Sequence, residues 1–146
     1  MRADPRLLGY LTRSLSYEVG SVLQYMVDAQ QCSQWQSHSY AKQFRESVQH
    51  ELEHIALLVD ALVKLGVSPA VPGLPSVRLC QTVRQMMYTN AELESRVIQH
   101  YEDALQYCIR RGDETHESLF ANILNDETSH LEQLDSQTQF LRSTED

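Results

Sequence analysis

The sequence predicts an all-α protein, a bundle of four long helices. Apolar residues recur at alternating steps of three and four through most of the chain, which is the spacing of one face of a helix. Only five Gly and four Pro occur among 146 residues, and 42% of the residues are hydrophobic, which suits a compact helical protein. A chain of this length fits one domain, so residues 1–146 are expected to form a single domain.

The first two helices are expected at residues 5–34 and 39–65. Asp4 can cap the first of them, and Pro5 is tolerated at a first helical position. In the first helix the inward positions are Leu8, Leu11, Leu15, Glu18, Val22, Tyr25 and Ala29. In the second they are Phe44, Val48, Glu51, Ile55, Leu58, Leu62 and Leu65.

The other two helices are expected at residues 77–110 and 114–141. Gly112 is a common type of helix terminator, and Asp113 can cap the helix that follows. The inward positions of the third helix include Val83, Met87, Glu94, Val97, Tyr101 and Cys108. Those of the fourth include Phe120, Ile123, Glu127, His130, Leu134 and Leu141.

The connections predict how the helices are joined. Those between helices one and two and between three and four are short, so each pair forms an antiparallel hairpin. Residues 66–76 contain three prolines and can extend over about 40 Å, which is also the length of a 27-residue helix. This linker can run the length of the bundle and place helix three parallel to helix two, as in ferritin-like bundles. The alternative is an ordinary surface loop.

Four glutamates occupy inward positions where Leu or Val would be expected: Glu18, Glu51, Glu94 and Glu127. Burying ionised carboxylates without partners costs several kcal/mol, and clustering them adds repulsion. Protonated acids or bound cations would relieve this cost. Two divalent metal ions carry the charge that balances four carboxylates.

The spacing of these residues strengthens the metal hypothesis. Glu51 and His54 form a Glu-x-x-His motif, as do Glu127 and His130, and residues three apart share one helix face. The lone Glu18 and Glu94 each precede such a motif by 33 residues, and the two sets are offset by 76. This arrangement is the di-iron or di-manganese carboxylate pattern of helix bundles. Oxygen and nitrogen donors without thiolate favour iron or manganese. The alternative is a coincidental set of polar core residues.

Composition excludes several other classes of protein. A formal net charge of −8 argues against nucleic-acid binding and favours attraction of cations. Cys32, Cys80 and Cys108 have no Cys-x-x-Cys spacing, which excludes a rubredoxin-type site and leaves three reduced, mostly buried cysteines as the expectation. No stretch resembles a signal peptide or a membrane span, so no membrane association and a cytoplasmic location are expected.

The residues resemble bacterioferritin across nearly the whole chain. The matching stretches are Tyr17-Glu-Val-Gly-Ser-Val-Leu-Gln-Tyr25, Trp35, His50-Glu-Leu-Glu-His54, Ala91-Glu-Leu-Glu94 and Asp126-Glu-Thr-Ser-His130. The resemblance implies a ferroxidase with two iron ions per subunit, which oxidises Fe(II) with O2 or H2O2 and stores ferric mineral in a shell. It implies that Glu18 and Glu94 are terminal ligands, that Glu51 and Glu127 bridge, and that His54 and His130 each hold one iron. It also matches Tyr25 to a family tyrosine that delivers an electron; a packing tyrosine is the alternative.

Three departures from the family pattern change what is expected. Leu52 replaces the methionine that ligates haem, so haem is not expected through this chain, although a haem-binding partner subunit is conceivable. Glu46 and His50 exchange the types of two inner-surface residues, and either an accessory iron site or solvated side chains fits them. The sequence ends at Asp146, which leaves too few residues for the fifth helix of the family.

Two functional readings follow. The first is a ferroxidase-active bacterioferritin-like subunit of a homo-oligomer that stores or detoxifies iron. The second is a non-storage di-iron peroxidase or a ferritin-like protein of low oligomeric state, which the short C-terminus favours. A structural subunit that binds metal without consuming oxygen is the third alternative. The number of subunits, the oxidant and any partner chain are left open by the sequence.

Overall fold

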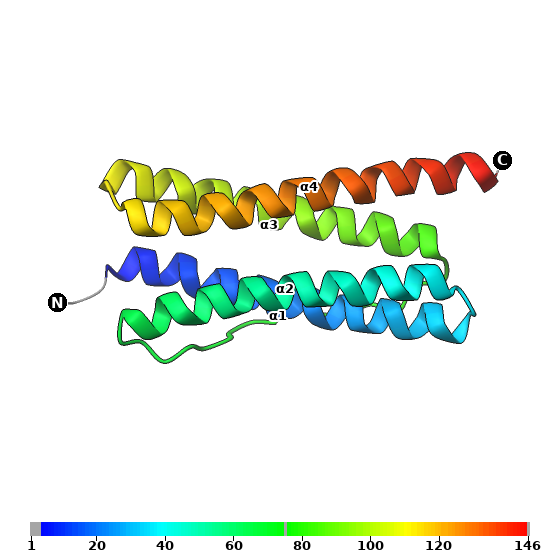
Figure 1. Ribbon diagram of the computed structural model, residues 1–146, viewed down its shortest axis with the longest axis horizontal. Coiled ribbons are helices and arrows are strands. Elements are labelled where there is room, and N and C mark those ends of the chain that lie inside the picture. The colour runs from blue at the N-terminus through cyan, green and yellow to red at the C-terminus, as the bar shows by residue number, and fades with distance from the viewer. Residues whose placement is uncertain (1–3, 75, 146) are drawn as a thin grey trace. The chain divides into compact units, whose positions relative to one another are not determined.

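The computed structural model describes residues 4–74 and 76–145, and within them the chain forms four α-helices and no strand. Their bounds are α1 Pro5–Gln34, α2 His38–Lys64, α3 Val83–Arg111 and α4 Glu114–Glu145 (Figure 1). Residues 1–3, Pro75 and Asp146, which belong to the expected termini and linker, lie outside the described residues. In the described part of the chain, no helix combines the length and apolar character needed to cross a membrane.

The chain divides into two compact units, residues 1–79 and 80–146. In the first unit, α1 and α2 pack as an antiparallel hairpin joined by Trp35–Ser37 (Figure 1). In the second, α3 and α4 form an antiparallel hairpin joined by Gly112 and Asp113. The predicted pairing of consecutive helices is confirmed.

Helices α1, α2 and α4 each begin within one residue of their predicted starts, whereas α3 does not. The Asp4 carboxylate accepts a hydrogen bond from the Arg6 amide at 3.1 Å, and Asp113 accepts one from the His116 amide at 3.2 Å, so both predicted caps are confirmed. Helix α1 ends where predicted, and α2 begins and ends one residue earlier than predicted.

The prediction that the third helix begins at residue 77 is wrong. Thr82 has an extended backbone, and its hydroxyl accepts a hydrogen bond from the Gln85 amide, so Thr82 is the cap and α3 begins at Val83. The segment before it is held away from helical geometry because the Arg78 amide and carbonyl both bond to the Gln24 side chain.

The prediction that the fourth helix ends at residue 141 is also wrong, because α4 continues to Glu145. Apolar periodicity marks the part of a helix that is buried, whereas the backbone hydrogen bonds of the helix can continue through polar residues. The last inward residue is Leu141, and the turn beyond it is exposed at Arg142 and Ser143.

The first three helices end with the same backbone motif. An amide beyond the helix bonds to the carbonyl five residues back, namely Ser37 to Cys32, Val67 to Leu62 and Asp113 to Cys108, at 2.8–2.9 Å. The residue before each of these amides has a left-handed backbone: Gln36, Gly66 and Gly112. The motif stops each helix sharply, which allows the short hairpin turns and starts the crossover after α2.

The crossover occupies residues 65–82 and runs back along the α1–α2 hairpin (Figure 1). Two contacts attach it to α1 in parallel order. The Ser16 hydroxyl donates to the Pro72 carbonyl at 2.8 Å, and the Gln24 side chain pairs with both backbone groups of Arg78 at 2.9 Å. The predicted fold, two antiparallel helix pairs joined by a long crossover, is confirmed.

Gln24→Ala tests what holds the crossover. Gln24 is buried, and its removal leaves the Arg78 amide and carbonyl without their side-chain partner and deprives Asp28 of a hydrogen bond. We expect the free energy of unfolding to fall by about 1–3 kcal/mol, as for other part-buried groups that lose hydrogen bonds. Urea unfolding measures this loss, with Gln49→Ala at an exposed position of α2 as the control. Equal losses in the two variants would contradict this role of Gln24.

Candidate metal centre

The first helix pair brings three of the predicted ligands together: Glu18, Glu51 and His54. The His54 Nδ1 atom lies 3.5 Å from a Glu18 oxygen and 3.6 Å from a Glu51 oxygen. Glu18 is 1% exposed and Glu51 2% exposed, and His54 is also buried. Glu51 and His54 share a face of α2 because they are three residues apart, and the α1–α2 hairpin brings Glu18 to them.

The second helix pair brings the other three together: Glu94, Glu127 and His130. The His130 Nδ1 atom lies 3.5 Å from a Glu94 oxygen. Glu94 is 0% exposed and Glu127 is 1% exposed, while His130 is half-buried. We call these two sets of three residues the triads. Each triad combines one lone glutamate with one Glu-x-x-His motif, and in each the imidazole contacts the lone glutamate.

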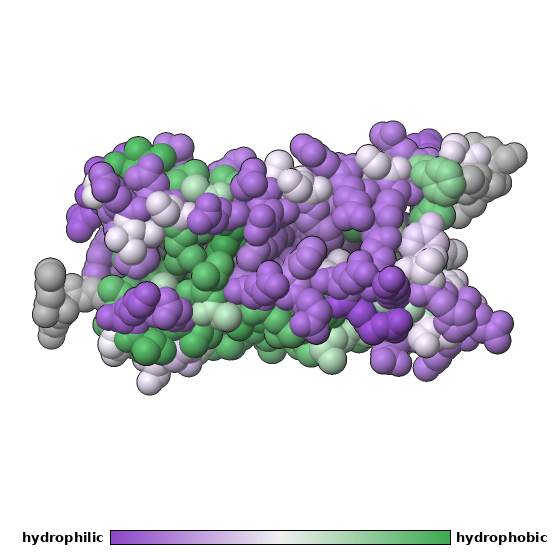
Figure 2. Space-filling view, in the orientation of Figure 1, coloured by the Kyte–Doolittle hydropathy of each residue, from purple (hydrophilic) through white to green (hydrophobic). Residues whose placement is uncertain are grey.

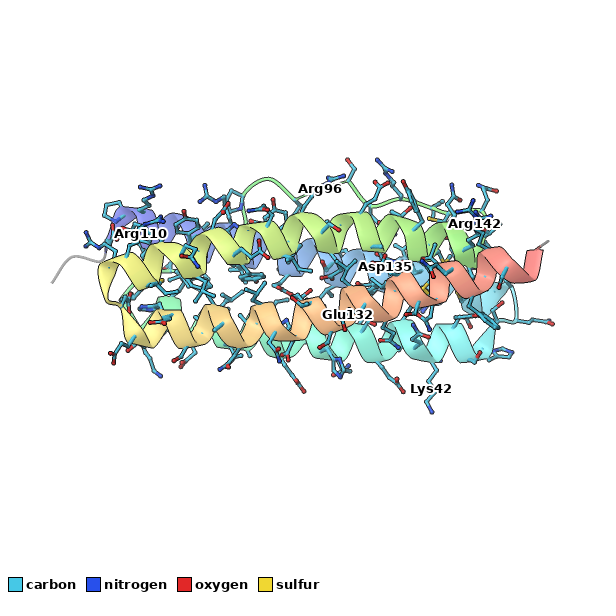
Figure 3. All side chains as sticks on the ribbon, turned by 90° about the horizontal axis from the view of Figure 1, so that it is seen from above. Lys42, Arg96, Arg110, Glu132, Asp135 and Arg142 are labelled. Carbon is cyan, nitrogen blue, oxygen red and sulfur yellow. The ribbon has the colours of Figure 1, made fainter. Side chains whose placement is uncertain are left out.

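The burial of these acids distinguishes them from most other acids of the same helices. Glu132 and Asp135 on α4, one to two turns beyond Glu127, are exposed. Figure 3 shows them on the outer surface of α4, as it shows Arg96 on α3 and Lys42 on α2. Hydrophilic side chains cover much of the face of α4 that is visible in Figure 2. Most acidic side chains in the described part of the chain face solvent, and the exceptions are the glutamates of the triads and Asp28.

Each triad has the donor set of a metal site. Its three ligand atoms, two carboxylate oxygens and one imidazole nitrogen, lie within 4.8 Å of one another. Donors about 2.1 Å from one ion and about 90–110° apart are about 3.0–3.4 Å from each other. The observed imidazole-to-carboxylate distances are close to this range, so each triad can hold a cation after a small contraction. Hard oxygen donors with imidazole suit iron or manganese.

The electrostatics of the second triad show what burial costs. Burial raises the pKa of the Glu94 carboxyl well above its usual value, and the neighbouring Glu127 carboxylate raises it further. The His130 imidazole acts in the opposite direction and lowers the pKa. Without a cation, Glu94 therefore holds a proton at a pH where an exposed glutamate is ionised.

Tyr25, the remaining predicted site residue, is completely buried on α1, and its ring stacks on Phe44 of α2 with centroids 6.1 Å apart. An equivalent pair occurs in the second unit, where the ring centroids of Tyr101 and Phe120 are also 6.1 Å apart, although these rings are tilted by 43°. The apolar periodicity predicts Tyr101 and Phe120 in the core but does not by itself relate them to Tyr25 and Phe44.

The offset of 76 residues, applied to every buried position, reveals the connection. It relates the two triads, the two tyrosine–phenylalanine pairs, Leu58 to Leu134 and Cys32 to Cys108. It also relates Gln36 to Gly112, the left-handed residues at the ends of α1 and α3. The two helix pairs are thus built on one plan at the level of individual side chains.

Buried polar groups outside the triads were not predicted. Asp28 of α1 is buried and accepts a hydrogen bond from Gln24 at 3.0 Å. Burial, and secondly the charge of Asp28, raises the pKa of the Cys32 thiol to about 11. All three cysteines are buried, as expected, and this high pKa keeps Cys32 a thiol rather than a thiolate at neutral pH.

Three further predicted positions lie on the surface of α2. Leu52 is exposed, and its side chain has no lone pair with which to ligate iron. Glu46 and His50 are four residues apart and both exposed, as solvated residues would be. The absence of haem and the accessory iron site therefore stay predictions.

Comparison with known proteins places this geometry in a family. The model of the ferritin-like domain matches residues 8–143, and the chain therefore belongs to the ferritin-like family. Within it, the chain is 26% identical to a bacterioferritin of Mycolicibacterium paratuberculosis over 97% of its own length and 89% of the relative's. A bacterioferritin of Brucella melitensis is 25% identical over 97% and 88% of the two chains, and bacterioferritin BfrA of Mycobacterium tuberculosis is 24% identical over 97% and 89%. The predicted resemblance to bacterioferritin is confirmed.

Glu94→Gln tests the electrostatic cost of the metal-free triad. Because the folded pKa of Glu94 is raised, the folded state keeps a proton that the unfolded state loses above about pH 4.3. The free energy of unfolding of the wild-type apoprotein should therefore fall as pH rises, by at most about 1.4 kcal/mol per pH unit for this group. The neutral glutamine removes this dependence and stabilises the apoprotein at pH 8.

Urea unfolding in the presence of a chelator, at pH 5 and pH 8, measures the difference. Glu102→Gln, at an exposed position of α3, is the matched control and should keep the wild-type pH dependence. If Glu94→Gln and wild type had the same pH dependence, the raised pKa of Glu94 would be refuted.

Proposed function

We propose that the protein is a bacterioferritin-like ferroxidase whose two triads bind two iron ions and oxidise Fe(II) to Fe(III) for iron storage or detoxification. One observation carries this proposal: each helix pair brings together the same set of two buried glutamates and one histidine. Membership of the ferritin-like family and similarity to bacterioferritins support it independently.

In this proposal Glu18 and Glu94 are terminal ligands, and Glu51 and Glu127 bridge the two ions. His54 and His130 would then hold one ion each through Nδ1, the nitrogen that faces Glu18 and Glu51 in the first triad and Glu94 in the second. Burial raises the pKa of Glu94 most and the neighbouring Glu127 raises it further; two Fe(II) ions would neutralise the four carboxylates and remove the second of these effects. The four carboxylates therefore favour a pair of divalent cations over a single ion.

The reaction balances with either of two oxidants. Two Fe(II) ions supply two electrons, which reduce O2 with two protons to H2O2, or reduce H2O2 by cleavage of its O–O bond to two hydroxide ions. The carboxylates and imidazoles keep the same donor set while the charge of the ions increases. Hard oxygen ligands stabilise Fe(III) more than Fe(II), which favours oxidation. Tyr25 supplies a further electron when the oxidant accepts one.

The same proposal covers how the subunits assemble and where haem would bind. The protein forms a homo-oligomer that encloses the ferric product, and haem, where present, is held by a partner subunit, since Leu52 cannot ligate it. The non-storage alternative keeps the same site in a smaller assembly that reduces peroxide.

Removal of a terminal ligand should abolish rapid iron oxidation. We expect Glu18→Ala or Glu94→Ala to lower the initial rate of aerobic Fe(II) oxidation at least about tenfold, since a change even to the groups that support metal ligands costs 10–100-fold. The growth of ferric absorbance after addition of two Fe(II) per subunit measures the rate.

Glu102→Ala on α3 is the control for general effects of losing an acid and should retain the wild-type rate. Anaerobic titration with Co(II), expected to show two ions per wild-type subunit, separates loss of binding from loss of oxidation. Equal initial rates in wild type and both ligand variants would refute the assignment of the site.

Solution mass distinguishes storage from the non-storage alternative. Storage requires a closed shell, so we expect native mass spectrometry to give 12 or 24 subunits. Iron-loaded protein should then contain far more than two iron ions per subunit and sediment as filled particles. A dimer that binds two iron ions per subunit and no more would refute storage while leaving the ferroxidase proposal intact.

A further inference from the structure

The second helix pair contains a buried tyrosine in the same place relative to its triad as Tyr25. Tyr25 follows Glu18 by seven residues, and Tyr101 follows Glu94 by seven. Seven residues make nearly two helical turns, so each tyrosine lies on the face of its glutamate, about 10.5 Å along the helix. Both side chains are 0% exposed.

The aromatic partner of each tyrosine is duplicated as well. Phe44 precedes Glu51 by seven residues, and Phe120 precedes Glu127 by seven. Because the helices of a pair are antiparallel, each phenylalanine meets the tyrosine at the same end of the triad, and both ring distances are 6.1 Å. The His100 ring adds an edge contact to Tyr101 at 5.3 Å. Long helical side chains lean towards the N-terminus, which directs both tyrosine rings back towards their glutamates.

A hydroxyl in such a place has a cost that packing alone does not explain. A buried phenol must find a polar partner, whereas phenylalanine fills nearly the same volume without that requirement. The chain uses phenylalanine at the adjoining positions 44 and 120 and tyrosine at 25 and 101. What tyrosine adds to phenylalanine is an O–H group that can give up one electron together with one proton.

We propose that Tyr101 is a second electron donor, which acts with Tyr25 to complete the reduction of O2 to water. This inference rests on the proposed ferroxidase function and names O2 as the oxidant. Complete reduction of O2 requires four electrons: two come from two Fe(II) ions, and one comes from each phenol. Each phenol O–H bond breaks and leaves a neutral phenoxyl radical. The two phenol protons and two protons from solvent form two water molecules as the O–O bond breaks.

Tyr101→Phe separates this role from packing because it removes the hydroxyl and keeps the ring. The first turnover is carried out with two Fe(II) per subunit and excess O2, and two quantities are measured. They are the tyrosyl radical, by freeze-quenched electron paramagnetic resonance, and the H2O2 released per O2 consumed. Wild type should give the radical and almost no H2O2. Tyr101→Phe should lose most of the radical and raise H2O2 towards one per O2, since one phenol cannot complete the four-electron reduction and the reaction then stops at the two electrons of the two Fe(II) ions. Tyr25→Phe should do the same.

Two controls isolate the hydroxyl. Tyr107→Phe changes another buried tyrosine of α3, which has no tyrosine counterpart in the first pair, and should match wild type in both readouts. With H2O2 as the oxidant, two Fe(II) ions suffice, so Tyr101→Phe should oxidise iron as wild type does. Tyr101→Leu, which also lacks the hydroxyl, replaces Tyr101→Phe if the latter does not bind two Co(II) ions anaerobically.

The outcomes separate this inference from the proposed function. Rapid O2 consumption with a wild-type radical and wild-type H2O2 yield in Tyr101→Phe would overturn the electron-donor role and leave the ferroxidase intact. Wild-type protein that binds two ions and consumes no O2 would overturn the ferroxidase proposal itself, and this inference with it.

Discussion

Four carboxylates that are excluded from water govern the rest of this protein. An ionised glutamate is stable in such a place only beside a cation or with a proton, and Glu94, whose carboxyl pKa is raised by burial and by Glu127, shows which of these the metal-free chain adopts. The surrounding structure must supply enough stability to tolerate that cost. Paired aromatic rings, capped helices and a crossover fixed along α1 contribute it. Buried acids lower the stability of the metal-free protein but give the site its affinity for cations. A bound cation restores the stability that the acids cost.

The internal duplication explains why equivalent side chains of the two helix pairs have equivalent positions. Inserting one residue in a helix turns everything beyond it by about 100°, so an insertion between Glu18 and Tyr25 would point one of them away from its neighbours. Triad, tyrosine, phenylalanine and helix end all keep the same offset in the two pairs. The sharp helix ends matter for this reason. By stopping α1 and α3 at equivalent residues, Gln36 and Gly112 fix the register in which α2 and α4 return.

Local chemistry made most of the fold and the site predictable. Helix caps at Asp4 and Asp113 act within a few residues, and the Glu-x-x-His spacing places ligands on one face of a helix without knowledge of the remainder. The start of α3 was not predictable in this way, because the backbone of Arg78, which lies outside any helix, is bonded to the side chain of Gln24, 54 residues away. The end of α4 was missed for another reason: apolar periodicity reports burial, and the helix continues beyond its buried part. The equivalence of Tyr25 and Tyr101 was present in the sequence but required the offset of the ligands to be applied to the other core residues.

The duplication also matches the electron requirement of the proposed reaction. In that reaction each helix pair would hold one Fe(II) with two acids and an imidazole, and so would supply one electron. With one buried phenol each, the two pairs would supply four electrons together, the number that O2 needs to become water. A site with ligands alone would stop at H2O2, which reacts with further Fe(II) to give radicals that damage protein. Tyr25 and Tyr101 would supply the remaining two electrons. The oxidised side chains would then lie in the dry interior of each hairpin, where each tyrosine is 0% exposed and its ring contacts a phenylalanine.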